Sequence, residues 1–345
     1  MQPGFFDLED RHNKLNERDP LIFLSQAIPW EDFRLTLEQV RQKKRKNNSG
    51  RKAFDVVLMF KALVLQHLYN ISDDELEFQI RDRYSFCRFL DLLPEDRVPD
   101  SKTLWLFREE LTKRNLVRKL FTEFELILQE RGYAAKKGQI IDASIVSAPV
   151  QRNSREENAQ IKQGEKPKRF SDNPAVDRQK DMEARWTEKH DQKYFGYKDH
   201  VSADVEHKII RDFEVTSAEV HDSQVFGEIL SENSNQSVWA DSAYRSENNE
   251  VLLEAMSYRS QVHQKARRGK PLTNRQTVAN QKKSRIRVRV EHIFGSITHE
   301  QGGMLIRVIG LARATTKIGL MNIVYNMRRL VTLLRISPPK RYKMS

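Results

Sequence analysis

The stretch Ile140-Ile141-Asp142-Ala143-Ser144-Ile145-Val146 carries the clearest structural signal in this chain. β-Branched residues dominate it and it holds no Gly or Pro, which is typical of a β-strand. A carboxylate in the middle of such a strand is costly to bury unless a cation or strong hydrogen-bond donors lie beside it. Asp142 therefore indicates a functional site, and a carboxylate that faces solvent at a sheet edge is the alternative.

Two more acidic residues lie in comparable settings downstream. Asp241 ends the apolar run 237–240, and Glu291 lies on a predicted helix around residues 288–294. The alternatives are that Asp241 only caps a helix and that Glu291 is an exposed helix charge. We expect Asp142, Asp241 and Glu291 to meet in space as metal ligands. Carboxylates suit Mg²⁺ or Mn²⁺, and two such ions about 3.5–4 Å apart can support in-line attack at phosphorus.

The pattern around these acids is strand–strand–strand–helix–strand–helix–strand–helix. Residues 194–201 and 208–215 predict a β-hairpin after the Asp142 strand. Three antiparallel strands followed by parallel additions make a mixed α/β sheet. Residues 151–191 are polar and are predicted to be a mobile insertion. The later elements are predicted as helices at 220–230 and 248–256 and strands at 237–240 and 258–264.

The chain before this sheet is predicted to be helical. Residues 51–132 form an all-α domain in which 54–69 is apolar nearly all round, as in a buried helix. A helix-turn-helix-like module and an ordinary helical bundle are both compatible with this pattern. Residues 1–50 form an N-terminal arm, and the run 41–52 holds seven basic residues and no acid. This run is either a solvated linker or a phosphate-contacting arm.

Length, charge and composition limit the class of protein. A chain of 345 residues exceeds the usual single-domain size, so we expect two main domains. The net charge of +12 favours a polyanionic partner, although membranes and acidic proteins also attract basic proteins. No stretch reaches the roughly 18 apolar residues that a membrane span needs, and no signal peptide is visible. We therefore expect a cytoplasmic protein, and its single cysteine cannot form an internal disulfide.

Five blocks of this sequence, in this order, resemble the bacterial insertion-sequence DDE transposases, and most closely the insertion-sequence-five family. Residues 50–108 resemble the family's N-terminal domain, so the resemblance covers the chain from about 50 to 336. It implies a ribonuclease-H-like DDE catalytic domain over 133–345 behind the all-α N-terminal domain. The five blocks are residues 140–144, 186–200, 216–223, 240–244 and 287–295.

The family pattern around the glutamate is Y-x2-R-x3-E-x6-K. Arg287 and Glu291 fit it, whereas Ser284 and Thr298 stand at the Tyr and Lys positions. Residues 255–290 contain eleven Arg and Lys and no acid, which favours contact with DNA over a solvated basic loop. We expect Arg287 to contact a phosphate. The other candidate DNA contacts are Arg289, Arg285, Lys283 and Lys198, the last of which could instead neutralise the metal site.

The resemblance implies a function as well as a fold. A transposase of this kind would bind the terminal inverted repeats of its element as double-stranded DNA, cut the ends with two Mg²⁺ or Mn²⁺ ions, and join the 3′-hydroxyls to target DNA. It would act as a homodimer that pairs two ends, near the bacterial nucleoid. A nuclease of the same core that does not join ends is one alternative. A DNA-binding derivative without catalysis is another, which the intact acids argue against.

Overall fold

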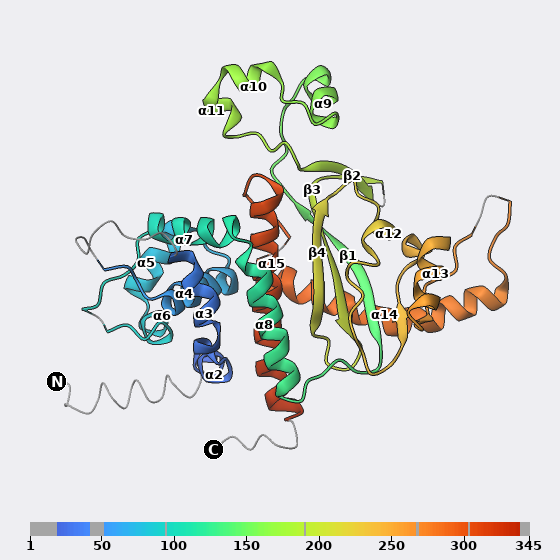
Figure 1. Ribbon diagram of the computed structural model, residues 1–345, viewed down its shortest axis with the longest axis horizontal. Helices are drawn as coiled ribbons and strands as arrows, with labels where there is room; N and C mark the ends of the chain where they lie inside the picture. Colours follow the sequence, from blue (N-terminus) through green and yellow to red (C-terminus); the bar gives the residue numbers. More distant parts are fainter. Residues whose placement is uncertain are drawn as a thin grey trace, which may run out of the picture. The chain divides into compact units, whose positions relative to one another are not determined.

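The computed structural model describes residues 19–41, 52–93, 95–189, 191–266, 269–302 and 304–338 (Figure 1). Most of the basic run predicted at 41–52 therefore lies outside the described residues. The chain divides into two compact units, Met1–Phe124 with Ile323–Ser345 and Glu125–Asn322. Helix α15 (Leu311–Ile336) begins in the second unit, and its part from Ile323 belongs to the first.

The first unit is helical, as its sequence predicted. The helix α4 is buried nearly all round and is capped by Asp55, whose side chain accepts from the N–H groups of Val57 and Leu58. Ser72 caps α5 and Asp100 caps α7 in the same manner. The helices are α2 (Pro20–Ala27), η1 (Trp30–Phe33), α3 (Arg34–Glu38), η2 (Gln39–Arg41), α4 (Val56–Tyr69), α5 (Asp73–Asp82), α6 (Tyr84–Phe89) and α7 (Ser101–Lys113). Helix α8 (Leu116–Glu130) begins in this unit, and its part from Glu125 belongs to the second.

The second unit is built on a mixed sheet, as predicted. Its order is β2-β3-β1-β5-β6, and β4 also pairs with β3. The β1–β3, β2–β3 and β3–β4 pairs are antiparallel, whereas β1–β5 and β5–β6 are parallel. The strands are β1 (Gln139–Ser147), β2 (Arg185–Lys189), β3 (Gln192–Asp204), β4 (Ile210–Ser217), β5 (Ser237–Trp239) and β6 (Arg259–Ser260).

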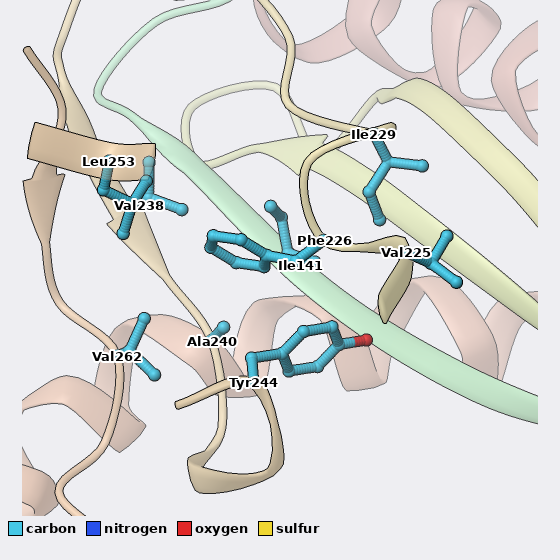
Figure 2. Close-up of a cluster of buried hydrophobic side chains, with 9 residues drawn as sticks. All are labelled: Ile141, Val225, Phe226, Ile229, Val238, Ala240, Tyr244, Leu253 and Val262. Carbon is cyan, nitrogen blue, oxygen red and sulfur yellow. The ribbon is translucent and has the colours of Figure 1, made fainter. Parts of the chain in front are cut away.

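The two faces of β1 have different roles. Ile141 faces a buried apolar cluster that also contains Phe226, Tyr244 and Leu253 (Figure 2). This cluster draws on α12 (Asp222–Val225), η3 (Ser242–Tyr244) and α13 (Glu247–Ala255). Because neighbouring residues of a strand point to opposite faces, Asp142 faces away from the cluster. The α14 helix (Asn274–Glu300) supplies the partner of Asp142.

Two predicted elements are shorter than expected. The helix predicted at 220–230 is limited to the four residues of α12, and the strand predicted at 258–264 to the two residues of β6. The apolar residues that suggested the longer helix are Val225, Phe226 and Ile229, and all three are buried in the cluster. The spacing of these apolar residues indicates that they are buried against the sheet. Irregular backbone can bury them as well as a helix can, so the spacing alone does not specify a helix.

Gly196 of β3 allows the strands at this end of the sheet to approach closely. Its φ is +153°, and a Cβ atom placed there would lie 2.2 Å from the carbonyl oxygen of Val146 and 2.8 Å from the nitrogen of Ala148. Any larger residue would force β1 and β3 apart. The glycine of the Gly196-Tyr197-Lys198 block is therefore required by packing between these strands.

The polar segment predicted as a mobile insertion contains helices α9 (Arg155–Lys162), α10 (Lys168–Asp172) and α11 (Pro174–Asp177), followed by β2. Phe170 is fully buried and Ile161 is nearly so, so these helices have a small core that the polar composition did not predict. Asp181 closes the base of the insertion. Its carboxylate accepts from the N–H groups of Glu183 and Ala184, the Tyr197 hydroxyl at 2.7 Å, and the N–H of Gly310.

None of the helices in the described ranges combines the length and the apolar character that crossing a membrane takes.

Candidate metal and DNA-binding site

Asp142 and Asp241 lie on neighbouring parallel strands. The β1–β5 register pairs Gln139 with Val238 and Ile140 with Trp239. The chain stays extended through Asp241, so the same register continued by two residues sets Asp241 beside Asp142. Adjacent strands of a sheet lie about 4.8 Å apart, and residues in register share a face. The two aspartates therefore form a pair at the carboxyl end of β5.

The Asp142 carboxylate is held by a cation and a backbone donor. Arg287 donates from Nη1 to Oδ2 at 2.6 Å, and the N–H of Ala143 donates to Oδ1 at 2.9 Å. Burial, with a smaller effect from the charge of Asp241, raises the pKa of Asp142 to about 6 against the opposing effects of Arg287 and the Ala143 N–H. Burial and a neighbouring negative charge thus disfavour the ionised form of Asp142, and Arg287 favours it.

Asp241 also caps the short helix η3. Its Oδ1 accepts from the N–H of Ala243 at 2.7 Å. Asp241 therefore does cap a helix, and the cap is compatible with a ligand role because its hydrogen bond uses one of the two oxygens. The cap fixes the direction of the carboxylate relative to the end of β5.

Glu291 lies on α14 and is joined to Asp142 through Arg287. Arg287 donates from Nη2 to Oε1 of Glu291 at 3.2 Å, and the Glu291 side chain is 56% exposed. Within the described residues, no three His, Cys, Asp or Glu side chains gather closely enough to hold a metal ion. The guanidinium of Arg287 occupies the space between Asp142 and Glu291 that such an ion would need.

The chemistry of these side chains fits a hard divalent cation. Asp142 and Asp241 are adjacent, partly buried, and together carry more negative charge than Arg287 neutralises. Glu291 is exposed enough to turn toward them without repacking the core. All of the donors are carboxylate oxygens, which suit Mg²⁺ and Mn²⁺ rather than zinc. The fit requires Arg287 to leave Asp142.

Most of the predicted DNA-contacting cations already have partners inside the chain. Lys198 donates to the carbonyl of Val220 and to Asp222 at 2.8 Å, on the face of the sheet opposite Asp142. Lys283 donates to the carbonyl of Val262 and Arg289 to that of Val205. Arg285 is exposed, and no contact of its side chain is described. Of this set, Arg285 is the exposed cation, whereas Arg287 is paired with Asp142 and Glu291.

His263 is a neighbour of the site that the sequence interpretation missed. Its N–H donates to the carbonyl of Ala240, which places it one strand beyond Asp241. Burial lowers the pKa of His263, and the charge of Arg287 lowers it further against that of Asp241, which favours the neutral ring. Its Nε2 lies 3.4 Å from Oγ of Ser284, the residue at the family's Tyr position. The predicted parallel strand at 258–264 was the signal that could have found it.

The sheet begins with antiparallel strands and continues with parallel ones, and acidic residues lie on adjacent strands and on a following helix. This arrangement defines a ribonuclease-H-like α/β fold that follows a helical N-terminal region. Family comparison agrees with this class. Residues 133–327 match the family described as a transposase DDE domain, and residues 9–110 match a transposase domain (DUF772). The chain belongs to the DDE transposase family, and this confirms the predicted resemblance to insertion-sequence transposases.

Among solved structures, the chain is similar to the piggyBac transposase in its synaptic complex with hairpin DNA. The sequence identity is 11% and the TM-score 0.44, with 92% of this chain and 76% of that chain covered. DDE transposases are enzymes that cut and transfer DNA and generally use divalent metal ions.

Proposed function

We propose that this transposase cuts DNA at the ends of its own insertion sequence and joins the resulting 3′-hydroxyls to target DNA, with Asp142, Asp241 and Glu291 as its catalytic metal ligands. The observation that carries the proposal is the register of β1 and β5, which sets Asp142 beside Asp241 on one face of the sheet. Arg287 links this pair to Glu291.

Each residue has a distinct part in the proposed reaction. Asp142 and Asp241 supply oxygen ligands from a rigid strand pair, and Glu291 supplies one from α14. Bound Mg²⁺ or Mn²⁺ would activate a water for the cut or a 3′-hydroxyl for the joining step and would stabilise the leaving oxygen. Neutral His263 lies behind Asp241 and adds no charge that would repel a cation. Arg287 and Arg285 provide positive charge for the phosphates, with Arg289 and Lys283 adding to the local field.

The partners follow from this chemistry. The protein would bind double-stranded DNA at terminal inverted repeats and at the target, and a homodimer would pair the two ends. The charge of +12 supports a polyanionic ligand. A position near the bacterial nucleoid follows from binding DNA.

The proposal is tested with single substitutions of the three acids. Asp142→Ala, Asp241→Ala and Glu291→Ala should each abolish Mg²⁺-dependent cleavage of DNA carrying the element's ends, while the proteins still bind that DNA. Glu254→Ala, which removes an exposed carboxylate from α13, is the matched control and should keep full activity. Full cleavage by any one of the three variants would remove that residue from the ligand set.

Strand transfer is measured separately on a supercoiled plasmid target. Products in which the cut ends are covalently joined to the plasmid are expected from the wild type. Cleavage without joined products would instead identify a metal-dependent nuclease of the same fold.

A further inference from the structure

Arg287 joins two of the three proposed metal ligands. Its Nη1 lies 2.6 Å from Oδ2 of Asp142 and its Nη2 lies 3.2 Å from Oε1 of Glu291. The arginine side chain is 22% exposed and that of Asp142 is 14% exposed, so this contact is largely shielded from solvent. The Nε atom of Arg287 is buried, and no hydrogen-bond partner for it is found among the described residues. The guanidinium is therefore held mainly by its two carboxylate partners, and its hydrogen-bonding capacity is not fully used.

No other cation of α14 makes this kind of contact. Along Asn274–Glu300, which is described throughout, Lys283 and Arg289 bind backbone carbonyls and Arg285 points to solvent. Only Arg287 is paired with carboxylates in this helix. The pairing neutralises Asp142, whose neighbour Asp241 would otherwise leave two partly buried negative charges side by side.

A divalent ion bound to Asp142 and the guanidinium at its Oδ2 would be two cations held against one carboxylate, and because like charges at such short distance repel strongly, they compete for it. On the basis of the metal site proposed above, we infer that Arg287 is the counter-ion of that site in the absence of metal. When a divalent ion replaces it, the Arg287 side chain turns to a DNA phosphate. A released guanidinium offers a planar set of donors that suits phosphate oxygens. The same side chain thus neutralises the carboxylate charge when no metal is bound and contacts a DNA phosphate when metal is bound.

This exchange makes metal binding and DNA binding strengthen each other. Metal frees one cation for DNA, and DNA draws that cation away from the metal ligands. By linkage, each ligand raises the affinity of the other by the same factor. One additional phosphate contact should steepen the dependence of log affinity on log salt by about one unit.

The test uses the full chain and a fluorescent DNA duplex of about 30 base pairs, because phosphate contacts do not depend on sequence. Affinity is measured by anisotropy over a range of KCl concentrations, with EDTA or with Ca²⁺, which takes the same kind of oxygen ligands. Ca²⁺ binding without DNA is followed by calorimetry. Arg287→Gln should bind Ca²⁺ more tightly than the wild type and should gain less DNA affinity from Ca²⁺. Arg285→Gln is the matched control: it should bind DNA more weakly but keep the Ca²⁺-induced gain.

A second pair of variants tests the counter-ion without metal. In EDTA, Asp142→Asn should bind DNA more tightly than Asp241→Asn. Both remove one negative charge, but only the first removes the partner of Arg287.

The outcomes separate the two proposals. An equal gain from both asparagine variants, or a full Ca²⁺-induced gain in Arg287→Gln, would refute the counter-ion role while leaving the metal site standing. Absence of Ca²⁺ binding to the wild type would instead refute the metal site.

Discussion

Replacing Asp199 by Asn should stabilise the protein at neutral pH, and the gain should grow as the pH rises. Asp199 lies on β3 and is 1% exposed. Its Oδ1 accepts from Nδ2 of Asn322 on α15 at 3.1 Å. Oδ1 of Asn322 is itself buried without a hydrogen-bond partner among the described residues. A protonated Asp199 supplies an O–H donor in this apolar setting, whereas an ionised one adds an uncompensated buried charge.

The size of the effect follows from the pKa. Burial raises the pKa of Asp199 from 3.8 to about 8, against the opposing effect of the Asn322 amide. The folded protein therefore keeps a proton that the unfolded chain releases above about pH 4. The contribution of this group to stability is complete below pH 4 and is lost as the pH rises to 8, by about 1.4 kcal/mol per unit and about 6 kcal/mol in all. Asn carries no such proton, so its advantage over Asp grows across this range.

The assay is urea unfolding followed by circular dichroism at several pH values between 5 and 8. The quantity of interest is the difference in unfolding free energy between Asp199→Asn and the wild type, since other titrating groups such as His200 cancel in it. Asp172→Asn, the same substitution on an exposed residue of α10, should leave the profile unchanged. A difference for Asp199→Asn that stays constant from pH 5 to 8 would refute the idea that a buried, protonated carboxyl holds this position.

Two further substitutions test the sheet around the site. Gly196→Ala should destabilise the protein by about 2–5 kcal/mol, because the added Cβ would clash with the carbonyl oxygen of Val146. Thermal unfolding measures this change, and a loss of stability below about 1 kcal/mol would contradict the close approach of the strands. Lys198→Met should lower stability by about 2 kcal/mol through loss of its bonds to Asp222 and Val220 and should leave the salt dependence of DNA binding unchanged. A shallower salt dependence would return Lys198 to the set of DNA contacts.

The sheet and its sequence of elements were predictable because they depend on local patterns. The alternation and β-branched content of the Asp142 strand, and the short link between the next two, specify an antiparallel start without long-range information. The order of the following helices and strands then determines the parallel continuation. For the same reason, the position of Asp241 at a strand end indicated that it would lie near Asp142.

Features that depend on contacts between distant residues were not predictable. Composition marked the insertion as polar, but its small core depends on Phe170 and Ile161, two apolar residues in a charged background. The pattern selected Arg287 as a phosphate contact and gave no sign of its bond to Asp142, which lies 145 residues earlier. The division of α15 between the two units was also not predicted, because a continuous helical pattern does not indicate which hydrophobic core each part of the helix packs into.

The carboxylate of Asp181 has a consequence for how the insertion can vary. This carboxylate accepts hydrogen bonds from three stretches of chain: the residues that lead into β2, Tyr197 within β3, and Gly310 just before α15. Among the described residues, no backbone hydrogen bond joins residues 149–180 to a strand of the sheet. Changes in the length of helices α9 to α11 would therefore leave the backbone pairing of the sheet intact, and they would disturb it only through side-chain contacts such as that of Arg185 with the carbonyl of Ile161.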